Sequence, residues 1–291
     1  MSCSQAASHD NLESHVEGVL SSILNTKQAI INQDKTRDAE DFIFLTFWDF
    51  DGTILKGDCS EGLSENGKTV YKGLSQLAIE NGYSSVYQPN QLNAFKTDYH
   101  HLEDTVGRWF VYPFLAQMMR GSSFDSVTQM AEQHFNKVLK DYYFSSSVHM
   151  FNTLESQNVI NHVISASADI FVDSSASTLN IAKTRFNGIE VQIEDGNITE
   201  KLVYPVTWSH GKTEKLQAIV KATEANNPGK KVVVLASFGN SYNTDGPFMK
   251  YVAEQSLPAG KPISVMINGG AAPEGYQQLF LEVNQTNIVT E

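Results

Sequence analysis

Four short apolar segments constrain the fold of this chain most. They span residues 42–48, 159–164, 232–236 and 263–267. They are too short for typical helices and rich in β-branched or aromatic residues, so each is expected to be a strand buried on both faces. Helical patterns separate the later strands, as in parallel sheets. The chain is therefore expected to form an α/β fold, a three-layer Rossmann-like core with a mainly parallel sheet.

The N-terminal region differs from this pattern. Residues 1 to about 10 are expected to be disordered, and a helix is expected from an N-cap at Asp10 to about residue 32. Apolar residues recur in it at helical spacing, namely Leu12, Val16, Val19, Leu20, Ile23 and Leu24. Packing on the main domain is favoured over docking to a partner. A charged linker, residues 34–41, follows.

Residues 58–150 carry helical periods and many aromatic residues, with no strong strand. They predict a helical cap inserted after the first strand. The expected division is an N-terminal tail and amphipathic helix (1–34), an α/β core (35–57 and 151–291) and the cap (58–150).

The later part of the core contains further predicted elements. A hairpin is expected around Asp195-Gly196, between residues 189–193 and 198–203. Helices are expected at four places: 169–181, from about Lys212, from about Gly246, and near 274–281.

Polar residues follow three of the predicted strands, at Asp49, Ser165 and Gly239. Ligands of parallel sheets sit beyond the carboxyl ends of the strands, so these residues are expected to converge on one site. Asp49 and Asp51 would repel each other unless a cation or a proton intervened, and Mg²⁺ prefers such oxygen ligands. Asp49 could then attack phosphorus, and Asp51 could protonate the leaving oxygen.

The string Asp49-Phe50-Asp51-Gly52-Thr53 resembles the first signature of the haloacid dehalogenase (HAD) superfamily. Ser165, Lys212 and residues 239–245 resemble the other three signatures, in the expected order. From the first to the last, the four signatures span roughly residues 43–250, most of the chain.

This resemblance implies roles for individual residues. Asp49 would be the nucleophile and a metal ligand, and Asp51 the general acid/base, with its backbone carbonyl on the metal. Ser165 and Lys212 would bind the phosphoryl group, with Ser167 and Lys215 as weaker alternatives. The remaining implied residues are Gly52 and Ala166 for phosphate, and Asn240 and Asp245 for Mg²⁺.

Asn240 departs from the pattern, because the family usually has an acidic metal ligand there. An amide oxygen can bind a hard cation but brings no charge, so Mg²⁺ should bind more weakly. Three interpretations stay open. The native enzyme works with Asn240, the residue results from an introduced Asp→Asn change, or the protein is a weakened or inactive relative.

The predicted reaction is Mg²⁺-dependent hydrolysis of a small phosphomonoester through an aspartyl-phosphate. Asp51 argues against dehalogenation, since dehalogenases of the superfamily lack it. The alternatives are a phosphate-ester-binding relative without turnover and a phosphotransferase.

The inserted segment resembles the cap of phosphoserine phosphatase-like and phosphorylcholine phosphatase-like members of the superfamily. The expected substrate is therefore phosphocholine or a phosphoserine-like metabolite. Trp109, Tyr112 and Tyr99 could surround a quaternary ammonium group. Arg108 could bind a carboxylate or phosphate. Asp58 and Glu61 could face an amino group.

Composition excludes some function classes. The net charge of −12 argues against a nucleic-acid-binding surface. No stretch approaches the length of a membrane span and no secretion signal is visible, so a cytoplasmic location without membrane partners is expected. With only two cysteines, Cys3 and Cys59, a structural disulfide is not expected.

Overall fold

A computed structural model describes residues 3–289 of the chain, with side chains from residue 12 onward. Its centre is a six-stranded sheet in the order β10-β9-β8-β1-β4-β5, and all neighbouring strands in it are parallel. The strands are β1 (Phe42–Trp48), β4 (Val159–Ala168), β5 (Phe186–Ile189), β8 (Lys231–Gly239), β9 (Ile263–Ile267) and β10 (Leu281–Val283). The α/β fold expected from the sequence, and implied by the HAD resemblance, is confirmed.

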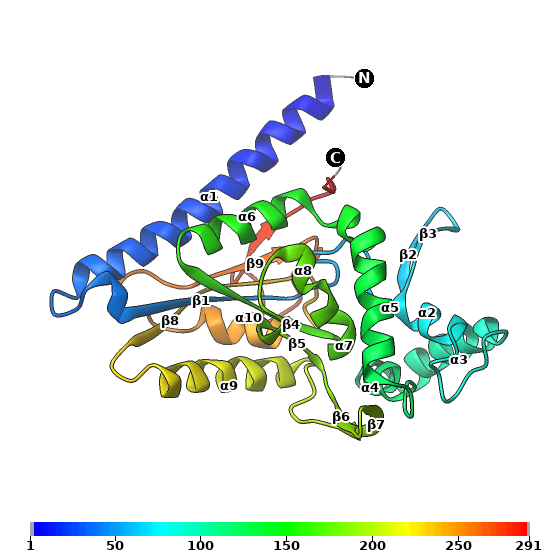
Figure 1. Ribbon diagram of the computed structural model, residues 1–291. Helices are drawn as coiled ribbons and strands as arrows, with labels where there is room; N and C mark the ends of the chain where they lie inside the picture. The colour runs from blue at the N-terminus through cyan, green and yellow to red at the C-terminus, as the bar shows by residue number, and fades with distance from the viewer. Residues whose placement is uncertain (1–2, 290–291) are drawn as a thin grey trace.

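Helices cover both faces of this sheet (Figure 1). On one face lie α1 (Cys3–Gln33) and α6 (Ser145–Ser156), and on the other α9 (His210–Asn226) and α10 (Gly246–Ala253). Among the described residues, no helix is long and apolar enough to cross a membrane.

The side chains of β1 point alternately to the two faces of the sheet, and both faces are covered by helices, so nearly every residue of this strand is buried. Phe44 and Trp48 belong to the cluster that contains Ile23 and Ile30 of α1. Leu45 and Phe47 belong to a second cluster with Leu216 of α9 and Phe248 of α10. Because successive side chains of a strand point to opposite faces, one apolar run supplies both layers of the core.

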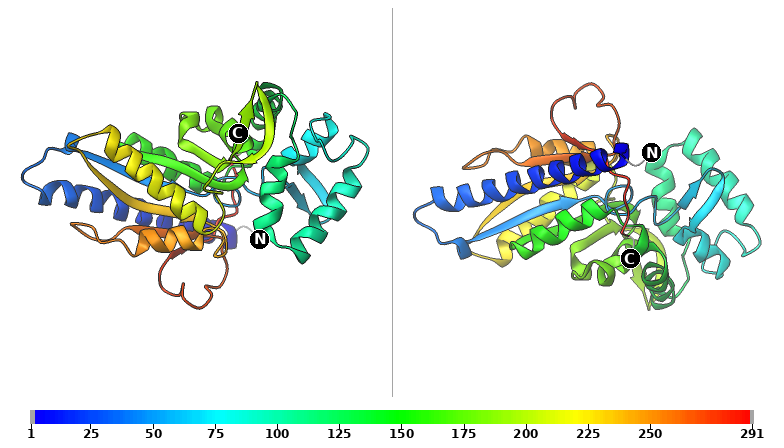
Figure 2. Two further views of the ribbon diagram at one scale, coloured as in Figure 1. Left: turned by 90° about the horizontal axis from the view of Figure 1, so that it is seen from below. Right: turned by 90° about the horizontal axis from the view of Figure 1, so that it is seen from above.

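The segment between β1 and β4 lies mostly beyond one end of the sheet (Figure 2). It contains α2 (Leu74–Glu80), α3 (Leu92–Thr105), α4 (Arg108–Gln117), α5 (Phe124–Lys137) and the 3₁₀ helix η2 (Leu139–Tyr142). It also contains an antiparallel hairpin, β2 (Gly62–Glu65) and β3 (Lys68–Lys72), which the sequence analysis missed. By contrast, α6 packs on β4 and α1.

The chain enters and leaves this inserted segment through two linkers that pair with each other. Leu55 forms an antiparallel bridge with Tyr143. The Lys56 N–H donates to the Tyr142 carbonyl at 2.9 Å, and the Phe144 N–H to the Ile54 carbonyl at 2.8 Å. The first linker (residues 54–56) starts directly after the Asp49–Thr53 segment and pairs with the second (residues 142–144), so the base of the insert adjoins the strand-end polar residues.

The structure corrects the expected start of the N-terminal helix and the helix expected near 274–281. The backbone is already helical from Cys3, so Asp10 lies inside α1 rather than at its N-cap, although the side chains of Cys3 and Asp10 lie outside the described part. No helix forms at 274–281, because Gly275 (φ +88°) and Gln278 (φ +62°) adopt left-handed conformations that interrupt a right-handed helix. Residues 1–2, also expected to be disordered, lie outside the described residues.

The expected helix 169–181 is broken into α7 (Asp169–Val172), the 3₁₀ helix η3 (Asp173–Ser175) and α8 (Ala176–Leu179), which ends at left-handed Asn180. Two further 3₁₀ helices are η1 (Ala39–Asp41) and η4 (Lys183–Arg185). The predicted hairpin is present as β6 (Val191–Glu194) and β7 (Asn197–Leu202). Asp195 and Gly196 both have positive φ in its turn, as a two-residue hairpin loop favours.

Candidate active site

Polar residues from several strand ends line one cleft of about 270 Å³ between the sheet and the inserted segment. Asp49 directly follows β1, Ser165 lies near the end of β4, and Asn240 directly follows β8. The full lining is Asp49, Asp51, Gly57, Asp58, Glu61, Gly62, Arg108, Tyr112, Ser165, Ala166, Ser167, Asn240, Ser241, Thr244 and Asp245. The convergence expected from a parallel sheet is therefore present.

Lys212 connects two of these carboxylates. Its Nζ donates to Asp49 Oδ1 and to Asp245 Oδ1, both at 2.6 Å, and its side chain is fully buried in the first turn of α9. Burial acts to lower the pKa of Lys212, but the charges of Asp245 and Asp49 outweigh it, so this pKa lies above its ordinary value. Lys212 thus supplies a fixed positive charge beneath Asp49.

Asp49 is held on both carboxylate oxygens. Thr53 Oγ1 donates to Asp49 Oδ2 at 2.8 Å, while Lys212 contacts Oδ1. Burial, and then the charge of Asp245, raises the pKa of Asp49 to about 6. The group is ionised at neutral pH and fixed in one orientation, as a carboxylate nucleophile requires.

Asp51 has a different environment, although only one residue separates it from Asp49. The Cys59 N–H donates to Asp51 Oδ1 at 2.6 Å, and Ser167 Oγ and Ser165 Oγ donate to Oδ2 at 2.7 and 3.3 Å. Burial, with the charges of Asp58 and Asp49, raises the pKa of Asp51 well above its ordinary value. A carboxyl group that keeps its proton can act as a general acid.

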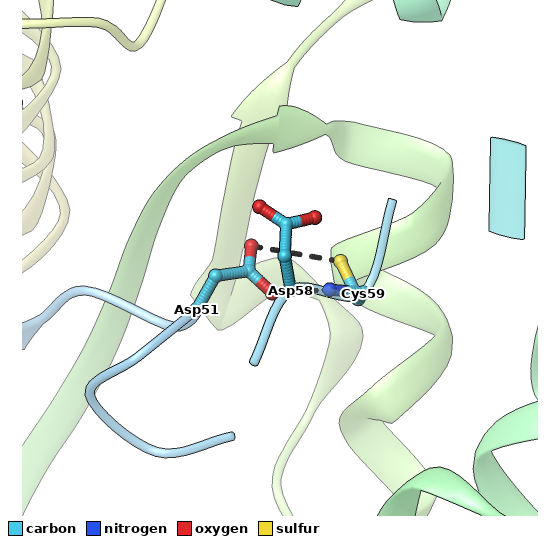
Figure 3. Close-up of side chains that lie close together, drawn as sticks. All are labelled: Asp51, Asp58 and Cys59. Atoms are coloured by element: carbon cyan, nitrogen blue, oxygen red, sulfur yellow. Dashed lines mark hydrogen bonds between the residues drawn. The ribbon is translucent and has the colours of Figure 1, made fainter. Parts of the chain in front are cut away.

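Figure 3 shows Asp51 beside Asp58 and Cys59, with the Asp51 carboxylate directed at Cys59. Oxygen or sulfur atoms of all three side chains lie within 4.8 Å of one another. Asp51 and Cys59 are joined by hydrogen bonds, and Asp58 Oδ1 accepts the N–H groups of Ser60 and Glu61 at 2.7 and 2.9 Å. These contacts hold the loop that closes one side of the cleft.

Acidic residues also line the part of the cleft that faces the inserted segment. Tyr99 OH donates to Glu61 Oε1 at 2.5 Å. Burial, followed by the charge of Asp58, raises the pKa of Glu61 to about 7. Arg108 and Tyr112 of α4 line this end, and Arg108 Nε is paired with Glu103 Oε1 at 2.7 Å. Two carboxyl groups, Asp58 and Glu61, therefore line this end together with one guanidinium, which is already paired with Glu103.

The segment after β8 presents Asn240 to the cleft. Asp245 Oδ2 accepts the N–H groups of Asn240 and Ser241, both at 3.0 Å, and so fixes this turn. Asn240 packs against Gly52, where an added Cβ would lie 1.9 Å from Asn240 Nδ2. The side-chain amide of Asn240 therefore adjoins the loop that carries Asp49 and Asp51.

The oxygen atoms of Asp49, Asp51 and Asn240 are of the type that binds Mg²⁺. The Asp49 carboxylate and the Asn240 side chain line one cleft, and oxygen donors suit a hard cation. The Asp51 carboxylate is engaged with Cys59 and Ser167, which leaves its backbone carbonyl as the donor that the resemblance assigns. Asp245 is engaged with Lys212 and the turn, so its contribution would be indirect.

Of the other site residues predicted from the sequence, some line the cleft and some do not. Ala166, Arg108 and Tyr112 line the cleft, whereas Tyr99 is buried behind Glu61. Trp109 is 57% exposed and does not line the cleft. The Gly52 N–H donates to the Leu55 carbonyl at 2.7 Å.

Sequence reasoning missed two contributors to this region. Thr53 stands in the first signature but received no role, and its position next to Gly52 was a usable signal. Gln285 reaches the Thr53 carbonyl from the C-terminal segment, and no local sequence pattern marks it.

No protein-family model and no curated protein matches the chain. Solved structures do resemble it. A protein of unknown function from Bordetella pertussis Tohama I is 10% identical, with 83% of this chain and 98% of that one covered at a TM-score of 0.62. A functionally unknown protein from Anaerococcus prevotii is 12% identical. The match covers 90% of this chain and 93% of that one, at a TM-score of 0.56. An HAD-family hydrolase from Salmonella enterica serovar Typhi is 12% identical. The match covers 83% of this chain and 68% of that one, at a TM-score of 0.49. The first two establish a shared fold.

Proposed function

We propose that the chain is a magnesium-dependent phosphatase of the HAD superfamily that hydrolyses a small phosphomonoester through an aspartyl-phosphate at Asp49. The observation that carries this proposal is the Lys212 bridge to Asp49 and Asp245, at 2.6 Å each, beneath a cleft that Asp51 and Ser165 also line. Four sequence segments contribute to it, and all four resemble signatures of the superfamily, the fourth with Asn240 in place of the usual acidic residue.

In the first step, an Asp49 oxygen forms a bond to phosphorus while the bond to the leaving oxygen breaks. The leaving oxygen keeps that electron pair and takes the proton of Asp51, whose raised pKa supplies it. Lys212 and Thr53 hold the Asp49 carboxylate in line during the attack. The Ser165 hydroxyl, which donates to Asp51 Oδ2 at 3.3 Å, would turn to donate to a phosphoryl oxygen.

In the second step, the Asp51 carboxylate takes a proton from water. The water oxygen bonds to phosphorus, the bond to Asp49 breaks, and inorganic phosphate leaves. Mg²⁺, held by Asp49, the Asp51 carbonyl and Asn240, would offset negative charge on the phosphoryl group. The inserted segment acts as a cap that excludes bulk water.

The substrate class follows from the far end of the cleft. Asp58 and Glu61 place two acidic groups there, and a cationic group on the substrate would offset their charge. Phosphocholine and phosphoserine-like metabolites meet this requirement. Recognition would rest on the carboxylates and on Tyr112 rather than on an aromatic cage, because Trp109 and Tyr99 do not line the cleft.

Hydrolysis of an aryl phosphate, measured with Mg²⁺ and with a chelator, tests the reaction. Asp49→Asn should abolish turnover, while exposed Asp125→Asn should leave it unchanged. Metal-independent ligand binding without turnover would instead support an inactive relative with a weakened metal site at Asn240. Product partition that depends on an added acceptor would indicate a phosphotransferase.

A panel of metabolites tests the substrate class. Phosphocholine and phosphoserine should have higher kcat/KM than alkyl phosphates of similar size that carry no cationic group. Glu61→Gln should reduce that preference, and equal kcat/KM for esters with and without a cationic group would contradict it. The expected cytoplasmic location stays a prediction.

A further inference from the structure

The C-terminal segment forms hydrogen bonds with the second linker of the inserted segment, residues 142–144, and with the start of α6. Ile288 forms an antiparallel bridge with Phe144, and the Val289 N–H donates to the Tyr143 carbonyl at 2.7 Å. The Ser145 N–H in turn donates to the Asn287 carbonyl at 3.0 Å. Since Leu55 pairs with the other side of Tyr143, three chain segments form one small ladder at the base of the insert.

Gln285 extends this ladder into the interior. Its Nε2 donates to the Thr53 carbonyl at 3.2 Å and to Ser147 Oγ at 2.8 Å, and Ser147 Oγ donates to the same carbonyl at 2.6 Å. Ser146 Oγ donates to Gln285 Oε1. Gln285 is 2% exposed, so its amide is committed to these partners.

The backbone of Gln285 is fixed as well. Its N–H donates to Asn268 Oδ1 at 2.8 Å, and its carbonyl accepts from Asn268 Nδ2 at 2.9 Å. Asn268 directly follows β9, so the sheet itself anchors the segment. A buried amide with every polar group paired holds its neighbours in one arrangement, because any shift would leave a buried group unpaired.

Thr53 joins this network to the reacting groups. Its carbonyl is the shared acceptor of Gln285 and Ser147, and its hydroxyl donates to Asp49 Oδ2 at 2.8 Å. The hydrogen bonds to the Thr53 carbonyl hold this residue in place. Because its hydroxyl donates to Asp49, the orientation of the Asp49 carboxylate depends on where Thr53 lies.

We propose that Gln285 is a positioning residue, through which the C-terminal segment holds Thr53 and the base of the cap so that Asp49 stays oriented for attack. This proposal rests on the proposed phosphatase function for its kinetic consequences. Its structural consequence, the restraint of the two linkers, does not depend on turnover.

Gln285→Met keeps the length of the side chain and removes its hydrogen bonds. It should lower kcat about 10-fold with little change in KM, since misorientation affects the reaction more than binding. Neighbouring Thr286, which is exposed, offers the matched control Thr286→Ala, which should leave both constants unchanged. Ser147→Ala, which removes only one of the two donors to Thr53, should give a smaller loss in kcat.

A double-mutant cycle separates positioning from general destabilisation. In a Thr53→Val background the hydroxyl that reaches Asp49 is absent, so Gln285→Met should lower kcat by less than about 2-fold further. Equal losses in both backgrounds, with thermal unfolding showing folded protein, would overturn the proposal.

Amide hydrogen exchange tests the restraint without any turnover. The N–H groups of Lys56 and Phe144 should exchange faster in Gln285→Met and Ser147→Ala than in the wild type, and not in Thr286→Ala. Unchanged exchange would overturn the proposal. If the wild type hydrolyses no phosphomonoester, the proposed function fails, and the exchange comparison still decides whether Gln285 restrains the linkers.

Discussion

The side-chain amide of Asn240 lies against the bare Cα of Gly52, so that a Cβ on Gly52 would come within 1.9 Å of Asn240 Nδ2. Gly52 also has φ +77°, a conformation that other residues rarely adopt. The segments after β1 and β8 therefore approach each other more closely than any side chain at residue 52 would allow. This approach brings the Asn240 amide beside the Asp49–Asp51 loop.

Gly52→Ala should lower the free energy of unfolding by about 1–3 kcal/mol, because it combines backbone strain with a clash. Gly67→Ala is a matched control, since Gly67 has a similar φ of +74° but nothing within 4 Å of the added Cβ. Urea unfolding of both variants measures the difference. Equal destabilisation would mean that Asn240 does not pack against Gly52.

Asn240→Asp should tighten Mg²⁺ binding about 10-fold or more, because a carboxylate adds formal charge to an oxygen ligand set. The same change should destabilise the metal-free protein, since it adds a carboxylate to a cleft that Asp49, Asp51 and Asp245 already line. Calorimetric titration with Mg²⁺ and unfolding with and without the metal measure the two effects.

Asn243→Asp is the control for this prediction, because Asn243 lies on the same loop but is exposed and does not line the cleft. It should leave Mg²⁺ affinity unchanged. Equal gains in both variants would indicate a general charge effect rather than direct ligation at residue 240.

The sequence could predict the core of the fold because its signals are local. The apolar run of β1, the turn at Asp195-Gly196 and the strand β9 each carry their own pattern. The parallel arrangement was expected because helical patterns separate the later strands, whereas the order of the strands in the sheet is known only from the structure. The hairpin β2–β3 was missed because its strands are short, half exposed and carry few apolar residues.

The meeting of Asp49, Ser165 and Asn240 at one cleft could be predicted because each follows or ends a strand of the same parallel sheet. The hydrogen-bond partners within and around the site could not be predicted from the sequence. Tyr99 was expected to face a ligand but lies behind Glu61, since helical periodicity does not reveal which face meets the cleft. Gln285 contacts Thr53 across 232 residues of sequence, and only the tertiary structure brings them together.

The stability of the metal-free protein should depend on pH through Glu61. Burial and the charge of Asp58 raise the pKa of Glu61 to about 7 in the folded state, above its value in the unfolded chain. The folded state therefore binds this proton more tightly, so the contribution of Glu61 to stability is greatest at low pH. That contribution is lost as the pH rises through about 7.

Glu61→Gln removes this ionisation and leaves Tyr99 an amide oxygen as acceptor. Relative to the wild type, the variant should gain stability progressively between about pH 4.5 and pH 7.5, and the difference should level off above that range. Urea unfolding at several pH values measures it, with exposed Glu214→Gln as the control. A difference between Glu61→Gln and wild type that is constant with pH would contradict the raised pKa.

Lys212→Met leaves Asp49 and Asp245 as buried carboxylates with no counter-ion between them. Removing one partner of a buried ion pair typically costs about 3–5 kcal/mol, so the variant should be strongly destabilised at neutral pH and inactive. Lys215→Met, one turn further along α9 and only partly buried, should change neither property.

Adding Asp245→Asn to Lys212→Met should recover part of the stability, because it removes one of the two repelling charges and keeps an oxygen that can accept the Asn240 and Ser241 N–H groups. Activity should not return, since the positive charge beneath Asp49 is still missing. The loss in the single variant should also shrink as the pH falls, because Asp49 then takes up a proton, and without Lys212 its pKa should lie above the value of about 6 that it has in the wild type. Unfolding curves at neutral and acidic pH, together with turnover, decide whether Lys212 acts through this charge: recovery of turnover in the double variant would show that Lys212 serves only to neutralise Asp245.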